Sequence, residues 1–435
     1  MSKQTNAQPP EKLTGIELKK IPKSAVGAKA VASALNHIKN EVGLAKGLGL
    51  LKNLNQKYGF DCPGCAWPDP DEKRAFLAEY CENGAKAVAE EATRNKVSPL
   101  FFSTYSVSSL AKLSDYEIGK KGRITQPVYL PEGADYYKEI SWKEAFNLIA
   151  DELNALDSPD EAIFYTSGRT SNEAAYLYQL FVRQFGTNNL PDCSNMCHES
   201  SGAALTETLG IGKGSVTLDD FNHTDLIIVI GQNPGTNHPR MLTALGEAKK
   251  KGSKIITINP LPEVGLLNYK YPQNPLKWVG SGQDLTDLFL QVKINGDVAL
   301  LKIILKLMLK QEEDVPYSVF DYDFIKSKTY GIEDLLDDLE TYSIDYLLPQ
   351  TGLSLDEIKK AADLIINNEK IIICWAMGLT QHKNAVDNIR EIVNILLLKG
   401  SIGKKGAGTC PVRGHSNVQG DRTMGIWEKP KPSFL

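Results

Sequence analysis

Cysteine spacing carries the first chemical signal in this 435-residue chain. Cys62 and Cys65 form a C-x-x-C pair within the proline-rich segment DCPGCAWPDP (61–70), and this spacing lets two thiolates meet one zinc ion or two corners of an iron–sulfur cluster. A redox dithiol and an inert pair are the alternatives, although a redox dithiol more naturally opens a helix after a strand. Cys81 is either a third ligand or a thiol buried on an apolar helix face.

A second candidate site lies in the segment NNLPDCSNMCHESSGAAL, where Cys193 and Cys197 precede a small-residue helix expected to begin near Ser200. A thiolate just ahead of a helix amino terminus has a lowered pKa and is the form that binds metal or attacks. His198 is a candidate proton carrier, because an imidazole titrates near neutral pH. The same residues are also compatible with a structural histidine beside an inert cysteine.

The elements that position these residues alternate in type. Helical stretches are expected over 25–38 and 74–95, on either side of the cysteine pair. From residue 141 onward, strand-length apolar runs alternate with segments of helical periodicity, which is typical of parallel sheets with crossover helices. The expected strands include AIFYTS (162–167), LIIVIG (226–231), KIITINP (254–260) and KIIICWAMG (370–378).

Polar, loop-forming turns follow these strands, and in open α/β sheets ligands bind beyond the carboxyl ends of the strands. Together the turns favour a large phosphorylated cofactor. No G-x-G-x-x-G follows a strand and no P-loop is present, so nicotinamide and nucleoside triphosphates are set aside as primary ligands. The turns read TSGRTSNE, GQNPGTNHP, NPLPE and GLTQH.

Composition limits the functional class. Lys and Arg number 49 against 53 Asp and Glu, so the net charge of -4 gives no electrostatic case for binding nucleic acid. The polar amino terminus lacks a secretory signal and no apolar run is long enough to span a membrane, which predicts a cytoplasmic protein. In that compartment seven cysteines favour metal binding or reactive thiols over disulfides.

Six motifs follow one another in an order that resembles the molybdopterin oxidoreductase superfamily, and most closely its formate-dehydrogenase-like FdhF/YdeP branch. They are CPGCAWPDP, CENGAKAV, NMCHESSG, GQNPGTNHPRM, AMGLTQHKNAV and PVRGHSNVQGDRTMGI. The resemblance implies an α/β fold, with a small amino-terminal iron–sulfur domain followed by two doubly wound, Rossmann-like domains. The carboxyl-terminal β-rich domain of that family is missing, so the chain is expected to be an amino-terminal part.

The resemblance also sets expected boundaries. Residues 1–15 would be a disordered tail and 16–135 the iron–sulfur domain. One cofactor-binding domain would combine 136–192 with 365–435, and the other would comprise 193–364, beginning near the metal-binding cysteine.

By the same resemblance, Cys197 would bind molybdenum or tungsten as a thiolate, and His198 would move the proton. Arg413 would clamp a carboxylate substrate such as formate, because a guanidinium offers a planar fork of donors. The implied cofactor is molybdenum bis(molybdopterin guanine dinucleotide), with His238, His382 and His415 as further lining candidates. Its expected binding residues are Gly231, Gln232, Asn233, Pro234, Asn259, Pro260, Gly378, Thr380, Gln381, Asn417 and Gln419.

Formate dehydrogenases hold a [4Fe–4S] cluster with four cysteines, whereas this chain offers Cys62, Cys65 and Cys81. The cluster is therefore expected by similarity, without a complete ligand set. The implied activity is two-electron oxidation of formate or a related small substrate, with electrons passing through the cluster to an unidentified acceptor. The alternatives are a reductase on the same scaffold, and a non-catalytic zinc-holding fragment in which Cys197 is idle.

Overall fold

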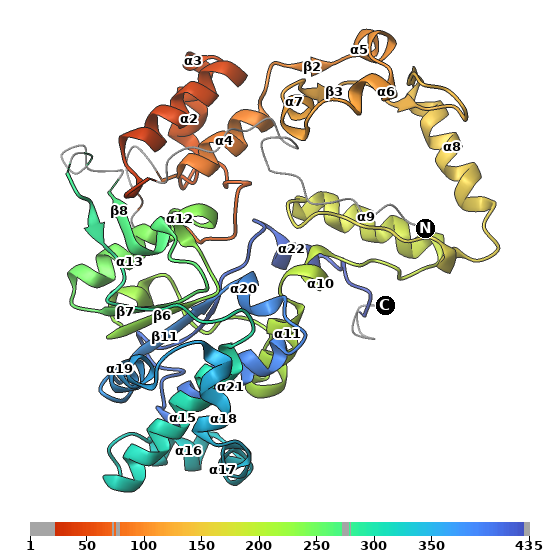
Figure 1. The fold of residues 1–435 in the computed structure, drawn as a ribbon. Coiled ribbons are helices and arrows are strands. Elements are labelled where there is room, and N and C mark those ends of the chain that lie inside the picture. The colour runs from red at the N-terminus through yellow and green to blue at the C-terminus, as the bar shows by residue number, and fades with distance from the viewer. Residues whose placement is uncertain (1–21, 72–73, 75–78, 272–277, 279, 430–435) are drawn as a thin grey trace.

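The computed structural model describes residues 22–71, 74, 79–271, 278 and 280–429. Its amino-terminal part is helical and packs around a small core of its own that includes Ile38, Leu54 and Val88 (Figure 1). The elements of this part are β1 (Ala25–Val26), α2 (Ala28–Glu41), α3 (Leu44–Asn53) and α4 (Glu82–Glu91).

The helix expected over 74–95 is shorter in the structure, and residues 75–78 lie outside the described residues. Helix α4 begins at Glu82, and Cys81 is its N-cap, whose Sγ accepts a hydrogen bond from the Gly84 amide at 3.4 Å. Cys81 therefore stands at a helix end, not on an apolar helix face. The extended backbone of the cap turns its side chain back over the first turn.

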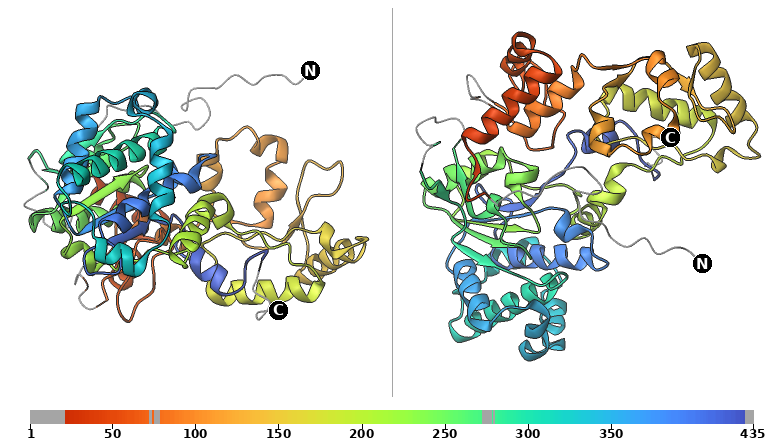
Figure 2. Two further views of the ribbon diagram at one scale, coloured as in Figure 1. Left: turned by 90° about the horizontal axis from the view of Figure 1, so that it is seen from below. Right: turned by 45° about the horizontal axis from the view of Figure 1, so that its top comes forward.

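Residues 95–190 form an arm that projects to one side of the molecule (Figures 1 and 2). Its elements are β2 (Lys96–Val97), α5 (Pro99–Thr104), α6 (Val107–Leu110), α7 (Asp115–Gly119), β3 (Arg123–Ile124), β4 (Val128–Tyr129), β5 (Lys138–Glu139), α8 (Trp142–Asn154), a 3-10 turn (Pro159–Glu161) and α9 (Asn172–Phe185). Strands β2 and β3 pair in parallel and β4 and β5 in antiparallel fashion.

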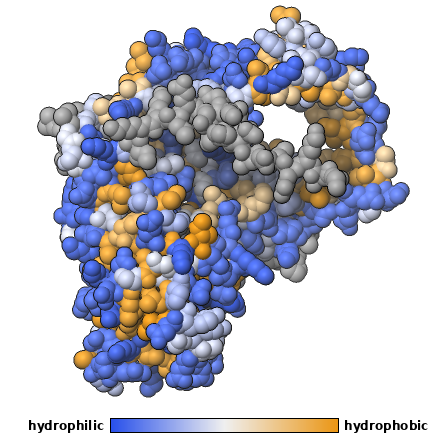
Figure 3. All heavy atoms as spheres, viewed as in Figure 1, coloured by the Kyte–Doolittle hydropathy of each residue, from blue (hydrophilic) through white to orange (hydrophobic). Residues whose placement is uncertain are grey.

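The strand expected over 162–167 is not part of a sheet in the described residues. Its Phe164 amide donates one hydrogen bond to the Asn189 carbonyl at 2.9 Å, and a single bond of this kind is not a ladder. The neighbouring helices leave apolar side chains exposed, among them Trp142 and Phe146 on α8 and Leu177 on α9. Apolar atoms accordingly gather along the arm around α8 (Figure 3).

A five-stranded parallel sheet forms the centre of the remaining chain, in the order β10-β7-β6-β11-β12. Every residue of β6 and β11 is buried, as expected for central strands that are covered on both faces. Ile228 of β6 lies opposite Ile256 of β7 and Ile373 of β11. The strands are β6 (Leu226–Ile230), β7 (Lys254–Ile258), β10 (Leu288–Leu290), β11 (Ile371–Trp375) and β12 (Gly408–Pro411).

Alternate residues of these strands enter two different cores, which is the signature of a doubly wound sheet. Ile228 belongs to the core beneath α11, α15, α19 and α21, whereas Ile227 and Val229 belong to the core beneath α13. These helices are α11 (Glu199–Leu209), α13 (Met241–Lys250), α15 (Asp297–Asp314), α19 (Leu355–Ile366) and α21 (Ala385–Leu398).

Shorter elements complete this part. They are α10 (Cys193–Cys197), a 3-10 turn (Asp219–Asn222), α12 (Pro234–Asn237), α14 (Val264–Leu267), β8 (Asn268–Lys270), β9 (Gln283–Asp284), α16 (Tyr322–Lys328), α17 (Ile332–Thr341), α18 (Ile344–Thr351), α20 (Met377–Thr380) and α22 (Val418–Thr423). Strand β8 pairs with β1 and β9, which ties the amino-terminal part to the sheet-bearing part. None of the helices in the described ranges is long and apolar enough to cross a bilayer.

The sheet bears on the expected domain boundaries. We expected 365–435 to join 136–192, whereas β11 and β12 lie in one sheet with β6, β7 and β10. A fully buried strand needs hydrogen-bonded neighbours on both sides, and β6 and β12 supply them for β11. Residue 365 therefore does not separate two sheets, and a second doubly wound domain stays a prediction.

Candidate functional site

The three cysteines Cys62, Cys65 and Cys81 line one cavity of about 400 Å³. Gly84, in the first turn of α4, makes room for two of the thiols. A Cβ at this position would lie 2.8 Å from Cys62 Sγ, so it would displace that thiol, and it would contact Cys81 Sγ at 3.9 Å. The grouping expected from the sequence is thus present as a shared cavity wall.

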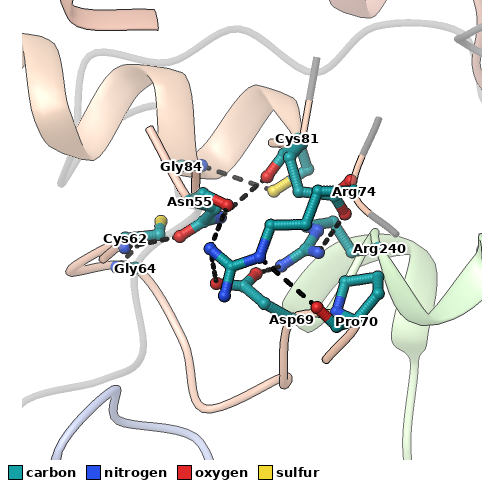
Figure 4. A network of polar contacts seen from close by, with 10 residues as sticks. Asn55, Cys62, Gly64, Asp69, Pro70, Arg74, Cys81, Gly84 and Arg240 are labelled. Carbon is teal, nitrogen blue, oxygen red and sulfur yellow. Dashed lines mark hydrogen bonds and ion pairs between the residues drawn. The ribbon is translucent and has the colours of Figure 1, made fainter. Parts of the chain in front are cut away.

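Asn55 shapes the loop that carries the first cysteine (Figure 4). Its Oδ1 accepts a hydrogen bond from the Cys62 amide at 2.8 Å, and its Nδ2 donates to the Glu79 carbonyl at 2.7 Å. Asn55 has a φ of 58°, in the left-handed region that asparagine tolerates better than most residues. One buried amide therefore links the two chain segments that bear the cysteines.

Burial raises the pKa of Cys62 and Cys65, and it raises the pKa of Cys81 to about 11. Thiols with this character need a cation to become thiolates, and bound iron or zinc acts in this way. Among the described residues, no three His, Cys, Asp or Glu side chains converge tightly enough to hold a single metal ion. An iron–sulfur cluster binds each thiolate at a different corner, whereas a single zinc ion requires the thiolates to meet at one point.

Cys197 is the last residue of α10, and its backbone is held by the turn that follows β11. Thr380 Oγ1 donates to the Cys197 carbonyl at 2.6 Å, and Gln381 Nε2 donates to the Met196 carbonyl at 2.9 Å. The thiol lies 4.0 Å from the position that a Cβ on Gly414 would occupy, and Gly414 lines the cysteine cavity. Cys197 is thus positioned directly behind one wall of that cavity.

The lowered pKa expected for Cys197 is wrong for the protein as it stands. Burial raises its pKa, although the Gly414 amide and the nearby Arg413 charge act in the opposite direction. The side chain is buried, and only the single residue His198 separates it from the first turn of α11. Desolvation outweighs the helix terminus here.

His198 is completely buried, and both of its ring nitrogens are occupied. Nε2 lies 3.1 Å from the Val412 carbonyl and therefore donates, so Nδ1 accepts from Ser201 Oγ at 3.0 Å. Ser201 in turn accepts from the Trp375 indole at 2.9 Å. Burial, assisted by the Arg413 charge, lowers the His198 pKa to about 3. The neutral imidazole thus connects α11 to the loop after β12 through two hydrogen bonds. Neither ring nitrogen is free to carry a proton.

Arg413 is buried close to Cys197, and its guanidinium is only partly paired. Nη2 donates to the Gly212 carbonyl at 3.1 Å, while Nε has no hydrogen-bond partner in the described part of the chain. Its main-chain carbonyl accepts from His238 Nε2 at 2.7 Å, which fixes the backbone of the loop. Burial lowers the Arg413 pKa, but an arginine keeps its charge. An unpaired buried donor of this kind suits an anion.

A second cavity, of about 290 Å³, lies at the carboxyl ends of β6, β7, β10 and β11. Gly231 and Gly378, from the turns after β6 and β11, line both this cavity and the cysteine cavity. Their backbones touch, since the Gly378 amide donates to the Gly231 carbonyl at 3.0 Å. A Cβ on Gly231 would lie 2.7 Å from the Gly378 carbonyl carbon. The expected residues Asn259, Pro260 and Gln381 line the same cavity, together with His382.

Other expected cofactor residues stabilise turns and line neither cavity. Gln232 is buried against α13, with Nε2 3.4 Å from His238 Nδ1. Asn233 caps α12 by accepting from the Thr236 amide, and Pro234 opens that helix. Asn417 donates to the Thr170 carbonyl at 2.6 Å. Gln419 lines a separate cavity of about 90 Å³ beside Arg413.

A family model for the molybdopterin oxidoreductases matches residues 123–425, which include both cavity-forming turns and the Cys197 segment. The chain belongs to the molybdopterin oxidoreductase family. An oxidoreductase of Mycobacterium tuberculosis that is called uncharacterized is 54% identical over 413 residues, 95% of this chain and 53% of that protein. Protein YdeP of Escherichia coli is 46% identical over 417 residues, 95% of this chain and 55% of YdeP.

The alpha subunit of the F420-dependent formate dehydrogenase of Methanocaldococcus jannaschii is 30% identical over 318 residues, 73% of this chain and 43% of that subunit. Together with YdeP, this relative confirms the formate-dehydrogenase-like FdhF/YdeP branch. Among solved structures, acetylene hydratase from Pelobacter acetylenicus matches with a TM-score of 0.53 and 20% identity, over 65% of this chain and 36% of that one, which supports the fold. The chain spans about half the length of the curated relatives YdeP and the mycobacterial oxidoreductase.

Sequence reasoning missed a buried acidic residue of this molybdopterin oxidoreductase that lines the strand-end cavity. Asp297 opens α15, is 6% exposed and lines the cavity together with His382, whose charge acts on it. The segment Asn295-Gly296-Asp297 between a strand and a long helix was the available signal, since such residues often begin helices. Lys293 lies in the same cavity wall, and its Nζ donates to the Pro349 carbonyl at 2.9 Å.

We predict that Asp297→Asn stabilises the fold at neutral pH. Burial raises the pKa of Asp297 from 3.8 to about 6, so the folded protein binds this proton more tightly than the unfolded chain does. Stability from this group therefore falls as pH rises between about 4 and about 6, and it stays constant above that range. Urea unfolding near neutral pH should show Asp297→Asn more stable by up to about 3 kcal/mol, a gain that vanishes below about pH 4.

The control is Asp337→Asn, which removes an exposed carboxylate from α17. It should show no comparable gain at neutral pH. An equal gain in both variants would mean that net charge, and not the buried carboxylate, is responsible.

Proposed function

We propose that this chain carries the substrate and electron-transfer sites of a formate-dehydrogenase-like oxidoreductase. The observation that carries this proposal is that Gly231, Gly378 and Gly414 line the same cavity as Cys62, Cys65 and Cys81. Those glycines belong to the strand-end turns beside the second cavity and to the loop beside Cys197. An iron–sulfur group and a large cofactor would therefore lie next to each other.

In this proposal the strand-end cavity takes one nucleotide of a molybdopterin guanine dinucleotide cofactor. Gly231 and Gly378 let the backbone approach closely, and Asn259 and Gln381 bring amides that read ring edges. Ionised, Asp297 would accept hydrogen bonds from the amino and imino groups of guanine. Cys197 would be the protein's soft ligand to molybdenum.

Bound at Cys197, the molybdenum centre would supply two-electron chemistry. This chemistry would convert formate to carbon dioxide with release of one proton and two electrons. Arg413 would orient the carboxylate, because its Nε has no hydrogen-bond partner among the described residues and its charge is desolvated beside Cys197. His198 would act by holding the Val412–Arg413 backbone in place, with its proton fixed on Nε2. Cys62, Cys65 and Cys81 would hold an iron–sulfur cluster, which would supply one-electron redox chemistry beside the molybdenum site.

The test is metal, sulfide and pterin analysis of anaerobically purified protein, followed by reduction of an artificial acceptor with formate. Brown protein that contains iron, acid-labile sulfide, molybdenum or tungsten and guanine-bearing pterin is the expected result. Colourless protein with zinc on its cysteines and no pterin would overturn the proposal. Protein that contains the metals and the pterin but does not oxidise formate would overturn only the proposed substrate.

A further inference from the structure

Arg240 is a partly buried cation at the junction of the cysteine-bearing segment and the sheet-bearing part (Figure 4). It precedes α13, and its side chain is 13% exposed. Its guanidinium donates to Asp69 Oδ1 at 2.5 Å and also to the Glu79 carboxylate. Both carboxylates belong to the segment that links Cys65 to Cys81, so Arg240 joins that segment to the sheet-bearing part.

Arg240 also lies beside the proposed cluster site. Arg240 lines the cavity that Cys62, Cys65 and Cys81 share, and its charge acts on the thiols of Cys62 and Cys65. One further charge is close to Asp69, since Arg74 Nη1 lies 3.8 Å from Asp69 Oδ2. Arg240 and Arg169 are thus the cations among the residues that line the cavity, whereas Asp69 and Glu79 are not among those lining residues.

We propose that Arg240 is a positioning residue that sets the reduction potential of the iron–sulfur cluster on Cys62, Cys65 and Cys81. This inference rests on the proposed function. A positive charge beside a cluster stabilises the reduced form, which carries one more electron, and burial keeps water from screening that interaction. Asp69 is expected to have the opposite effect on the reduction potential, because its carboxylate partly cancels the Arg240 charge.

The opposite signs of these two charges give the test. Potentiometric titration, followed by electron paramagnetic resonance, would measure the cluster potential in the full chain. Arg240→Gln should shift the potential to more negative values, Asp69→Asn should shift it to more positive values, and Arg240→Lys should stay near wild type. Arg390→Gln is the matched control, because Arg390 is an ion-paired but half-exposed arginine on α21.

If Arg240 were only structural, both Arg240→Gln and Asp69→Asn would break the same ion pair. The cluster potential would then shift in the same direction in both variants. Shifts of the same sign, or potentials equal to that of Arg390→Gln, would overturn the inference. If Arg240→Gln fails to hold iron, Asp69→Asn decides: a positive shift supports the inference and an unchanged potential overturns it. Wild-type protein without iron would instead overturn the proposed cluster, and with it the role of Arg240.

Discussion

Cys197→Ala is expected to reduce formate-dependent reduction of an artificial acceptor by about 100-fold or more, since even outer-shell partners of a metal site are worth 10–100-fold. The thiol lies within electrostatic range of Arg413, and Thr380 and Gln381 already hold the adjacent backbone in place. Alanine keeps the helix and removes the donor. The molybdenum signal in electron paramagnetic resonance should change with it, even where the metal itself is retained by the pterin sulfurs.

The control for that result is Cys193→Ala. Cys193 opens the same helix, is also buried, and has a pKa that burial raises to about 11. It therefore matches Cys197 in helix, burial and chemistry, but it is not the proposed ligand. Equal losses of activity in the two variants would assign the effect to packing of α10 and would contradict the ligand role.

Gly231→Ala should be the most damaging glycine substitution at the strand-end turns. Gly231 has a φ of 59°, so alanine there costs about 1–2 kcal/mol. Its Cβ would also press on the Gly378 backbone at 2.7 Å, and overpacking of this kind costs about 1–3 kcal/mol more. Urea unfolding measures the combined loss, and pterin content should fall with it because both cavities share this wall.

Gly210→Ala separates the two causes. Gly210 has a φ of 78° at the end of α11, and a Cβ there would meet nothing within 4 Å. It carries the same backbone strain without the clash. Equal destabilisation in Gly210→Ala and Gly231→Ala would show that the Gly231–Gly378 contact yields readily, and that the two turns are not held against each other.

The parts of the fold that follow from local pattern were predictable. Five consecutive apolar residues in LIIVI and IIICW predicted strands buried on both faces, and β6 and β11 confirm this. The expected strand at 162–167 has a comparable pattern, yet a strand exists only when another strand supplies its hydrogen bonds. Its partners cannot be read from its own residues.

The candidate site likewise has features that the sequence predicts and features that only the fold reveals. Cys62, Cys65 and Cys81 were grouped from spacing and resemblance, and they line one cavity, while their role as ligands stays a prediction. The state of His198 was not predictable, because its partner Val412 is 214 residues away and only the fold brings them together. Arg240 was likewise hidden, since its partners Asp69 and Glu79 are 171 and 161 residues away.

The bonds that hold Cys197 have a consequence for biosynthesis. Its carbonyl is bound by Thr380, 183 residues later, and the adjacent imidazole is bound by Val412. Contacts of such sequence separation form late in folding, because long loops must close first. A ribosome therefore has to release the chain beyond Val412 before this cysteine has its final position. On the proposed ligand role of Cys197, the metal would therefore be inserted only after the chain has been synthesised through Val412.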